Sequence, residues 1–123
     1  MTSFIVCIDH EQAKIFKMAV GHTEKLDLHH HVNLHHKNNQ EDKKKDFTKY
    51  FHEVAGKLNG ATEILILGHG IAKEQFVHHL KKHHHEELSK KVVGVETVDK
   101  PTDKQILDLA RRFFKDSHLF NPQ

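Results

Sequence analysis

Three short apolar segments, each followed by a polar or glycine-containing turn, make up the first part of the chain. Residues 4–8 (FIVCI) form a continuous apolar run rich in β-branched residues, which is typical of a strand buried on both faces. Residues 13–20 (AKIFKMAV) follow a four-residue polar turn, and so short a connection predicts a hairpin. Between residues 26 and 34, apolar side chains and His30 alternate with polar ones, which predicts a third strand with one apolar face. Together the three segments predict an antiparallel meander.

Three amphipathic helices are predicted after this meander. The first begins after the N-cap residue Asp46 and stops at Gly60, because glycine takes the left-handed C-terminal position at low cost. The second begins at Ile71, and the third is opened by Thr102, which has capping-box spacing to Gln105. The apolar residues that recur at helical spacing are Phe47, Tyr50, Phe51, Val54, Ala55 and Leu58 on the first helix, Ala72, Phe76, Val77 and Leu80 on the second, and Ile106, Leu109, Ala110 and Phe113 on the third.

Two further strands separate these helices. Residues 64–67 (ILIL) and 92–98 (VVGVETV) are apolar runs that predict buried strands. The element order is therefore β-β-β-α-β-α-β-α, and right-handed crossovers place the last two strands parallel to the first. We predict an α/β fold of the ribonuclease H-like architecture, a single domain over residues 1–123. It holds a mixed five-stranded sheet with an antiparallel meander, and helices cover its faces.

Composition adds only a weak signal about partners. The 19 Lys and Arg residues nearly balance the 17 Asp and Glu residues, so the formal net charge is only +2. The 15 histidines, with ordinary pKa values near ~6.5, would make the chain cationic below neutral pH. A lone Cys7 favours a reducing compartment, and the charged residues among the first twenty exclude the apolar core of a signal peptide. We therefore expect a cytoplasmic domain with no membrane partner.

A strongly polar segment connects the third strand to the first helix. Residues 35–45 (HHKNNQEDKKK) contain no side chain that favours burial, which predicts an exposed loop. A short C-terminal tail is predicted over residues 116–123. The loop places Lys37-Asn38-Asn39-Gln40 at one end of the predicted sheet.

This arrangement resembles the middle domain of eukaryotic and archaeal class-1 peptide release factors and of Pelota. In the release factors, the corresponding loop carries Gly-Gly-Gln at its tip, where this chain has Asn38-Asn39-Gln40. The segments GHGIAKEQFVHHL (68–80) and VVGVETVDKPTDKQILDLARRFF (92–114) resemble more closely the small bacterial translational machinery proteins, also labelled release-factor-like. The resemblance covers about residues 4–115. It implies a stand-alone domain that associates with the translation machinery and needs no cofactor.

The resemblance also points to the residues that contact RNA. Glycine reaches positive φ freely, whereas asparagine does so at a cost and carries a side chain. Asn38 and Asn39 therefore keep part of the turn capacity, and Gln40 keeps the amide that would be catalytic in a peptidyl-tRNA esterase. We favour binding of ribosomal or transfer RNA over catalysis. The predicted RNA-binding residues are His35, His36, Lys37, Asn38, Asn39, Gln40, Lys43, Lys44 and Lys45.

A glycine-containing turn precedes the second predicted helix. Gly68-His69-Gly70 lies at the helix N-terminus, where free N–H groups favour an anion, and Lys73 adds a positive charge in the first turn. Many strand-to-helix turns need glycine only for their geometry. The sequence leaves both interpretations of this turn open.

Two other functions remain as alternatives. A ribonuclease H-like nuclease needs three carboxylates that hold metal ions, and the chain offers Asp9 and Glu53, but no acid where the fourth strand ends. A metal-binding protein is suggested by the histidines, among which His79 and His83 have i, i+4 spacing on a helix. Clustered histidines also form ordinary solvated surfaces. His30, which interrupts an apolar strand face, is predicted to be a hydrogen-bonded histidine of the core or its rim.

Overall fold

The computed structural model describes residues 2–30, 40–83 and 85–119, with side chains described over 2–30, 46–83 and 85–114. The elements follow the predicted order, with one short helix added before the last strand. They are β1 (Ser3–Ile8), β2 (Gln12–Ala19), β3 (His22–His29), α1 (Gln40–Gly56), β4 (Glu63–Gly68), α2 (Ala72–Lys82), α3 (Glu86–Ser89), β5 (Val92–Thr97) and α4 (Asp103–Leu119). Within the described residues, no helix combines the length and apolar composition needed to span a membrane.

The five strands form one mixed sheet in the order β3-β2-β1-β4-β5. β1 pairs with β2 in the antiparallel direction and with β4 in the parallel direction, and β5 extends the parallel part. The central strands β1 and β4 are buried on both faces, as their continuous apolar runs predict. The predicted fold class and meander are confirmed.

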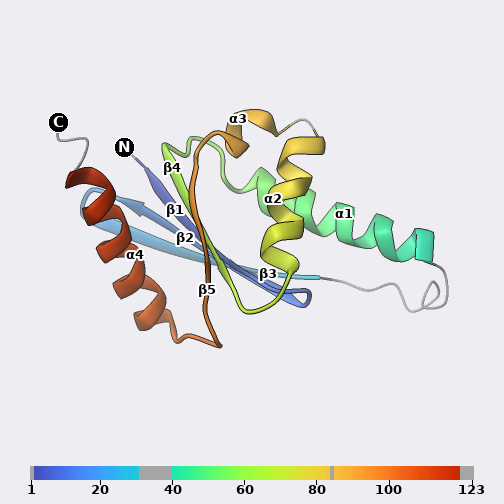
Figure 1. Ribbon diagram of the computed structural model, residues 1–123, viewed down its shortest axis with the longest axis horizontal. Coiled ribbons are helices and arrows are strands. Elements are labelled where there is room, and N and C mark those ends of the chain that lie inside the picture. Colours follow the sequence, from blue (N-terminus) through green and yellow to red (C-terminus); the bar gives the residue numbers. More distant parts are fainter. Residues whose placement is uncertain (1, 31–39, 84, 120–123) are drawn as a thin grey trace.

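Helices cover both faces of this sheet, with α4 on one side and α1, α2 and α3 on the other (Figure 1). Alternate residues of each central strand serve the two sides. Val6 and Ile66 pack in the core with Tyr50 and Phe76, whereas Leu65 packs with Ile106 of α4. The two cores arise because successive strand side chains point to opposite faces.

The start of α1 departs from the prediction. The helix begins at Gln40, so residues 40–45 are helical and Asp46 is not its N-cap. The predicted exposed loop over 35–45 is wrong for its second half, and residues 35–39 lie outside the described residues. Glu, Gln and Lys are good helix formers, and Glu41 and Asp42 in the first turn favour the positive end of the helix dipole. The polar side chains of residues 40–45 favour solvent, but they do so equally in an exposed helix and in a loop.

The third strand also begins earlier than its alternating pattern predicted. β3 spans His22–His29, and His22 pairs with Ala19 across the two-residue turn Val20-Gly21. Gly21, the second residue of this turn, has a φ of 72°, a conformation that glycine adopts at low cost. The part of the predicted strand beyond residue 30 lies outside the described residues.

The edge strand β5 differs from prediction in burial, and the last helix, α4, differs in length. β5 is not the buried strand that its apolar run predicted, since Val93 and Val95 are 42% and 38% exposed at the sheet edge. α4 continues to Leu119, so the predicted tail from residue 116 is helical as far as 119. The first helix-breaking residue after Thr102 is Pro122, which explains the longer helix.

The capping box before α4 is formed as predicted. The Thr102 amide donates to Gln105 Oε1 at 2.8 Å, and the Gln105 amide donates to Thr102 Oγ1 at 3.2 Å. Thr102→Ala is expected to lower the free energy of unfolding by about 1 kcal/mol, measured by urea denaturation. Thr48→Ala, an exposed threonine inside α1, is the matched control. A loss in Thr102→Ala no larger than in Thr48→Ala would contradict a capping role.

Candidate functional site

Four of the predicted RNA-binding residues fall at the start of α1. Gln40 is the first residue of the helix, and Lys43, Lys44 and Lys45 follow within it. The remaining residues of this set, 35–39, lie outside the described residues. RNA contact by this segment therefore stays a prediction.

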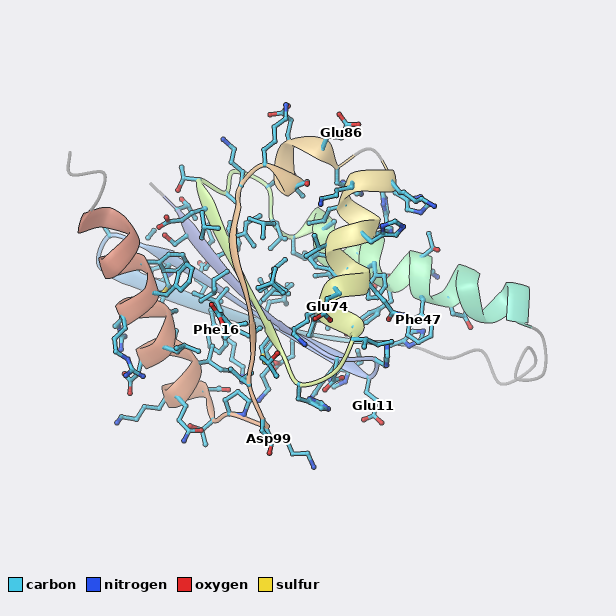
Figure 2. All side chains as sticks on the ribbon, viewed as in Figure 1. Glu11, Phe16, Phe47, Glu74, Glu86 and Asp99 are labelled. Carbon is cyan, nitrogen blue, oxygen red and sulfur yellow. The ribbon has the colours of Figure 1, made fainter. Side chains whose placement is uncertain are left out.

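A cavity of about 650 Å³ lies where β1, β4 and β5 end. The carboxyl ends of parallel strands meet at one edge of a sheet, which is a common place for ligand sites in α/β folds. In Figure 2, the labelled residues Glu11, in the β1–β2 turn, and Asp99, after β5, mark this edge of the sheet. Its polar lining includes Asp9, His10, Lys14, His69 and Lys100.

The Gly68-His69-Gly70 turn borders this cavity, and its two glycines have different surroundings. A Cβ atom on Gly68 would lie 2.6 Å from the carbonyl oxygen of Ile8, a backbone atom of β1. A Cβ atom on Gly70 would meet nothing within 4 Å. Gly68 is therefore required by the close approach of β4 to β1, whatever the turn binds.

The Lys73 ammonium group makes its contacts within the turn and the first residues of α2. Its side chain is almost fully buried, and its ammonium group donates to the Gly70 carbonyl oxygen at 2.5 Å. The Glu74 carboxylate lies 3.3 Å from the same nitrogen. The cations that line the cavity are instead Lys14, which lies 3.4 Å from the Asp103 carboxylate, and Lys100. Anion binding by Gly68, His69, Gly70 and Lys73 is untested and stays a prediction.

Asp9 has a structural role in the β1–β2 turn. Its Oδ1 accepts hydrogen bonds from the backbone amides of Glu11 and Gln12, at 2.7 and 2.8 Å. The Tyr50 hydroxyl donates to the Asp9 carbonyl oxygen at 3.0 Å, and burial raises the pKa of Tyr50. Glu53, the second candidate acid of the nuclease alternative, is exposed on α1. Nothing in this geometry favours a nuclease.

His30 is a hydrogen-bonded rim residue, as predicted. Its Nδ1 donates to the His10 carbonyl oxygen at 2.9 Å, which fixes the tautomer when the ring is neutral. The ring stacks on Tyr50, with centroids 5.0 Å apart, and lies 4.3 Å from the ring of Phe47. These contacts tie the end of the meander to α1.

A separate cluster of histidines lies where α1, α2 and α3 meet. His52 comes from α1, His79 from α2, and His85 immediately precedes α3. The Nδ1 of His52 and the Nε2 of His85 are 3.1 Å apart, within hydrogen-bond distance. Burial, together with the neighbouring histidines, lowers the pKa of His79 to about 4, so its ring is neutral at pH 7.

Sequence analysis identified only part of this cluster. His79 belongs to it, but the predicted second ligand, His83, instead stacks on the His79 ring with centroids 4.6 Å apart. The three histidines whose ligand atoms converge are His52, His79 and His85. His52 and His85 were missed because their proximity depends on how α1 packs against α2.

Comparison with known proteins gives a structural likeness without a sequence match. No protein-family model matches the chain, and no curated protein matches it. The Pelota proteins of Archaeoglobus fulgidus and Thermoplasma acidophilum share its fold with TM-scores of 0.64 and 0.62, at 18% and 16% identity, over 90% of this chain. The archaeal translation termination factor aRF1 gives a TM-score of 0.55 at 19% identity over 98% of this chain.

These neighbours are much longer proteins. The chain spans 31% and 32% of the two Pelota chains and 41% of the aRF1 chain. The likeness therefore concerns one part of each neighbour and establishes the fold. The five-stranded mixed sheet and its helices form an α/β domain that matches the middle-domain-like fold of Pelota and aRF1.

Proposed function

We propose that this chain is a translation-associated domain that binds ribosomal or transfer RNA, with the ribosome as its partner. The observation that carries the proposal is the shared fold over 90–98% of the chain with Pelota and with a translation termination factor. That likeness agrees with the resemblance in the sequence itself, which covers about residues 4–115.

The start of α1 supports contact with RNA. The N-terminal end of a helix presents free backbone N–H groups and a partial positive charge, both of which favour phosphate. Gln40 is the first helical residue, and three lysines follow at 43–45. In the release-factor resemblance, this same connection carries the functional tip.

RNA binding is favoured over catalysis because the residues at the expected catalytic positions suit neither an esterase nor a nuclease. In the resemblance to the release factors, Asn38 and Asn39 correspond to the two glycines of the Gly-Gly-Gln motif. In the nuclease alternative, Asp9 already accepts two hydrogen bonds within its own turn. Burial also raises the pKa of the Cys7 thiol, which disfavours the nucleophilic thiolate.

Sedimentation of the untagged protein with ribosomal particles tests the proposal. At low salt, we expect the protein to sediment with these particles, and to leave them as the salt concentration rises, because phosphate contacts release counterions. Treating the lysate with ribonuclease before centrifugation is the control, and it should return the protein to the supernatant. Protein that stays in the supernatant at low salt without this treatment would show the proposal to be wrong. Competition with purified transfer RNA would then separate the two kinds of RNA.

A further inference from the structure

The histidine cluster between α1, α2 and α3 has the geometry of a metal site. One ligand nitrogen from each of His52, His79 and His85 lies within 4.8 Å of the other two. The elements that carry them are close in space although His52 is 27 residues before His79. Figure 1 shows α1, α2 and α3 together on one face of the sheet, and Glu86 of α3 marks that end of the molecule in Figure 2.

His79 provides a second observation that points to a ligand. The residue is only 5% exposed, and its buried Nε2 has no hydrogen-bond partner among the described residues. A buried polar atom without a partner costs about 1–3 kcal/mol, so native structures rarely leave one unsatisfied. The ring is held by Phe51 on one side, at 5.7 Å between centroids, and by His83 on another.

We propose that His52, His79 and His85 bind one divalent transition-metal ion, for which Zn²⁺ is the best fit. Neutral imidazole is a preferred ligand of Zn²⁺, and three protein ligands with a fourth open position are a common arrangement for it. With Zn–N distances of about 2.0–2.1 Å, tetrahedral geometry places ligand nitrogens about 3.3 Å apart. The nitrogens of His52 and His85 already lie 3.1 Å apart.

Binding needs only small side-chain movements. The separations of at most 4.8 Å must shorten to about 3.3 Å, which the exposed His52 and the half-buried His85 can provide by rotating their rings. His79 needs no desolvation, since its nitrogen is already buried. The ion would link α1, α2 and the start of α3. The site keeps His79 from the pair that helical spacing suggested and adds His52 and His85. It is independent of the proposed RNA contact.

Metal titration of the untagged, chelator-treated protein tests the proposal. Co²⁺ serves as the spectroscopic probe, because tetrahedral nitrogen coordination gives it visible absorption bands, and Zn²⁺ is then added in competition. We expect one equivalent of Co²⁺ to bind with such bands and to be displaced by Zn²⁺. His52→Ala and His85→Ala should each weaken Zn²⁺ binding at least about 10-fold. Both variants change side chains outside the buried core, so circular dichroism should confirm an unchanged fold.

His78→Ala is the matched control. His78 is a neighbour of His79 on the same helix, but it is exposed and lies outside the converging set. It should bind Zn²⁺ as the wild type does. Zn²⁺ should also raise the melting temperature of the wild type and of His78→Ala, but not of the other two variants. If all three variants bind Zn²⁺ alike, the ion sits elsewhere among the 15 histidines and the proposal is wrong.

Discussion

Replacing Gly68 with alanine is expected to lower the free energy of unfolding by about 3 kcal/mol, because the close-packed backbone leaves no room for a Cβ atom. That atom would lie 2.6 Å from the carbonyl oxygen of Ile8. Ile8 ends β1, which is hydrogen-bonded to strands on both sides and cannot move away without disturbing the centre of the sheet. Urea denaturation followed by far-ultraviolet circular dichroism measures the loss.

Gly70→Ala is the matched control, two residues along the same turn. A Cβ atom there meets nothing within 4 Å, so the change should stay within about 0.5 kcal/mol of the wild type. Equal losses in the two variants would mean that the turn needs its glycines for another reason. The expected difference assigns Gly68 to the packing of β4 against β1 and leaves Gly70 free for ligand contact.

Changing Lys43, Lys44 and Lys45 together to glutamate is expected to weaken association with ribosomal particles by about 100-fold at low salt. Three charge-assisted phosphate contacts of about 1 kcal/mol each would be lost, or about 3 kcal/mol in total. Losing three contacts should also reduce the slope of log affinity against log salt by about 2 to 3. Quantitative sedimentation over a range of salt concentrations gives both values.

A second triple variant separates location from net charge. Lys81, Lys82 and Lys90 are exposed lysines near α2 and α3, and their change to glutamate alters the net charge by the same amount. We expect this variant to retain most of the affinity and the salt slope of the wild type. Equal weakening in both variants would contradict a specific role for the start of α1.

The strands β1 and β4 and the start of α4 were predictable because a local pattern in the sequence determines each of them. The continuous apolar runs of β1 and β4 predicted strands that are covered on both faces, and both strands are buried in this way. The capping box was equally local, since Thr102 and Gln105 are three residues apart. Where a pattern had two physical meanings, prediction failed. The polar run 40–45 suits both a loop and the first turns of a helix, and the apolar run of β5 suits both a central strand and an edge strand.

The candidate sites were less predictable because they depend on tertiary contacts. The turn at Gly68 was identified from its glycines, but its contact with Ile8 arises only when β4 pairs beside β1. Lys73 lies in the predicted place, yet its ammonium group binds the Gly70 carbonyl oxygen inside the turn. His79 was identified from helical spacing, whereas His52 and His85 join it through helix packing. Spacing along one helix cannot reveal such neighbours.

The length of α1 determines how far its first residue stands from the body of the domain. The helix has 17 residues and so measures about 25 Å, at 1.5 Å per residue. Phe47, which packs against the core and lies beside the His30 ring, follows Gln40 by seven positions, or about 10 Å along the helix axis. The start of α1 extends beyond α2 in Figure 1. Gln40 can therefore enter a recess about one helix diameter deep before the rest of the domain meets the surface around it.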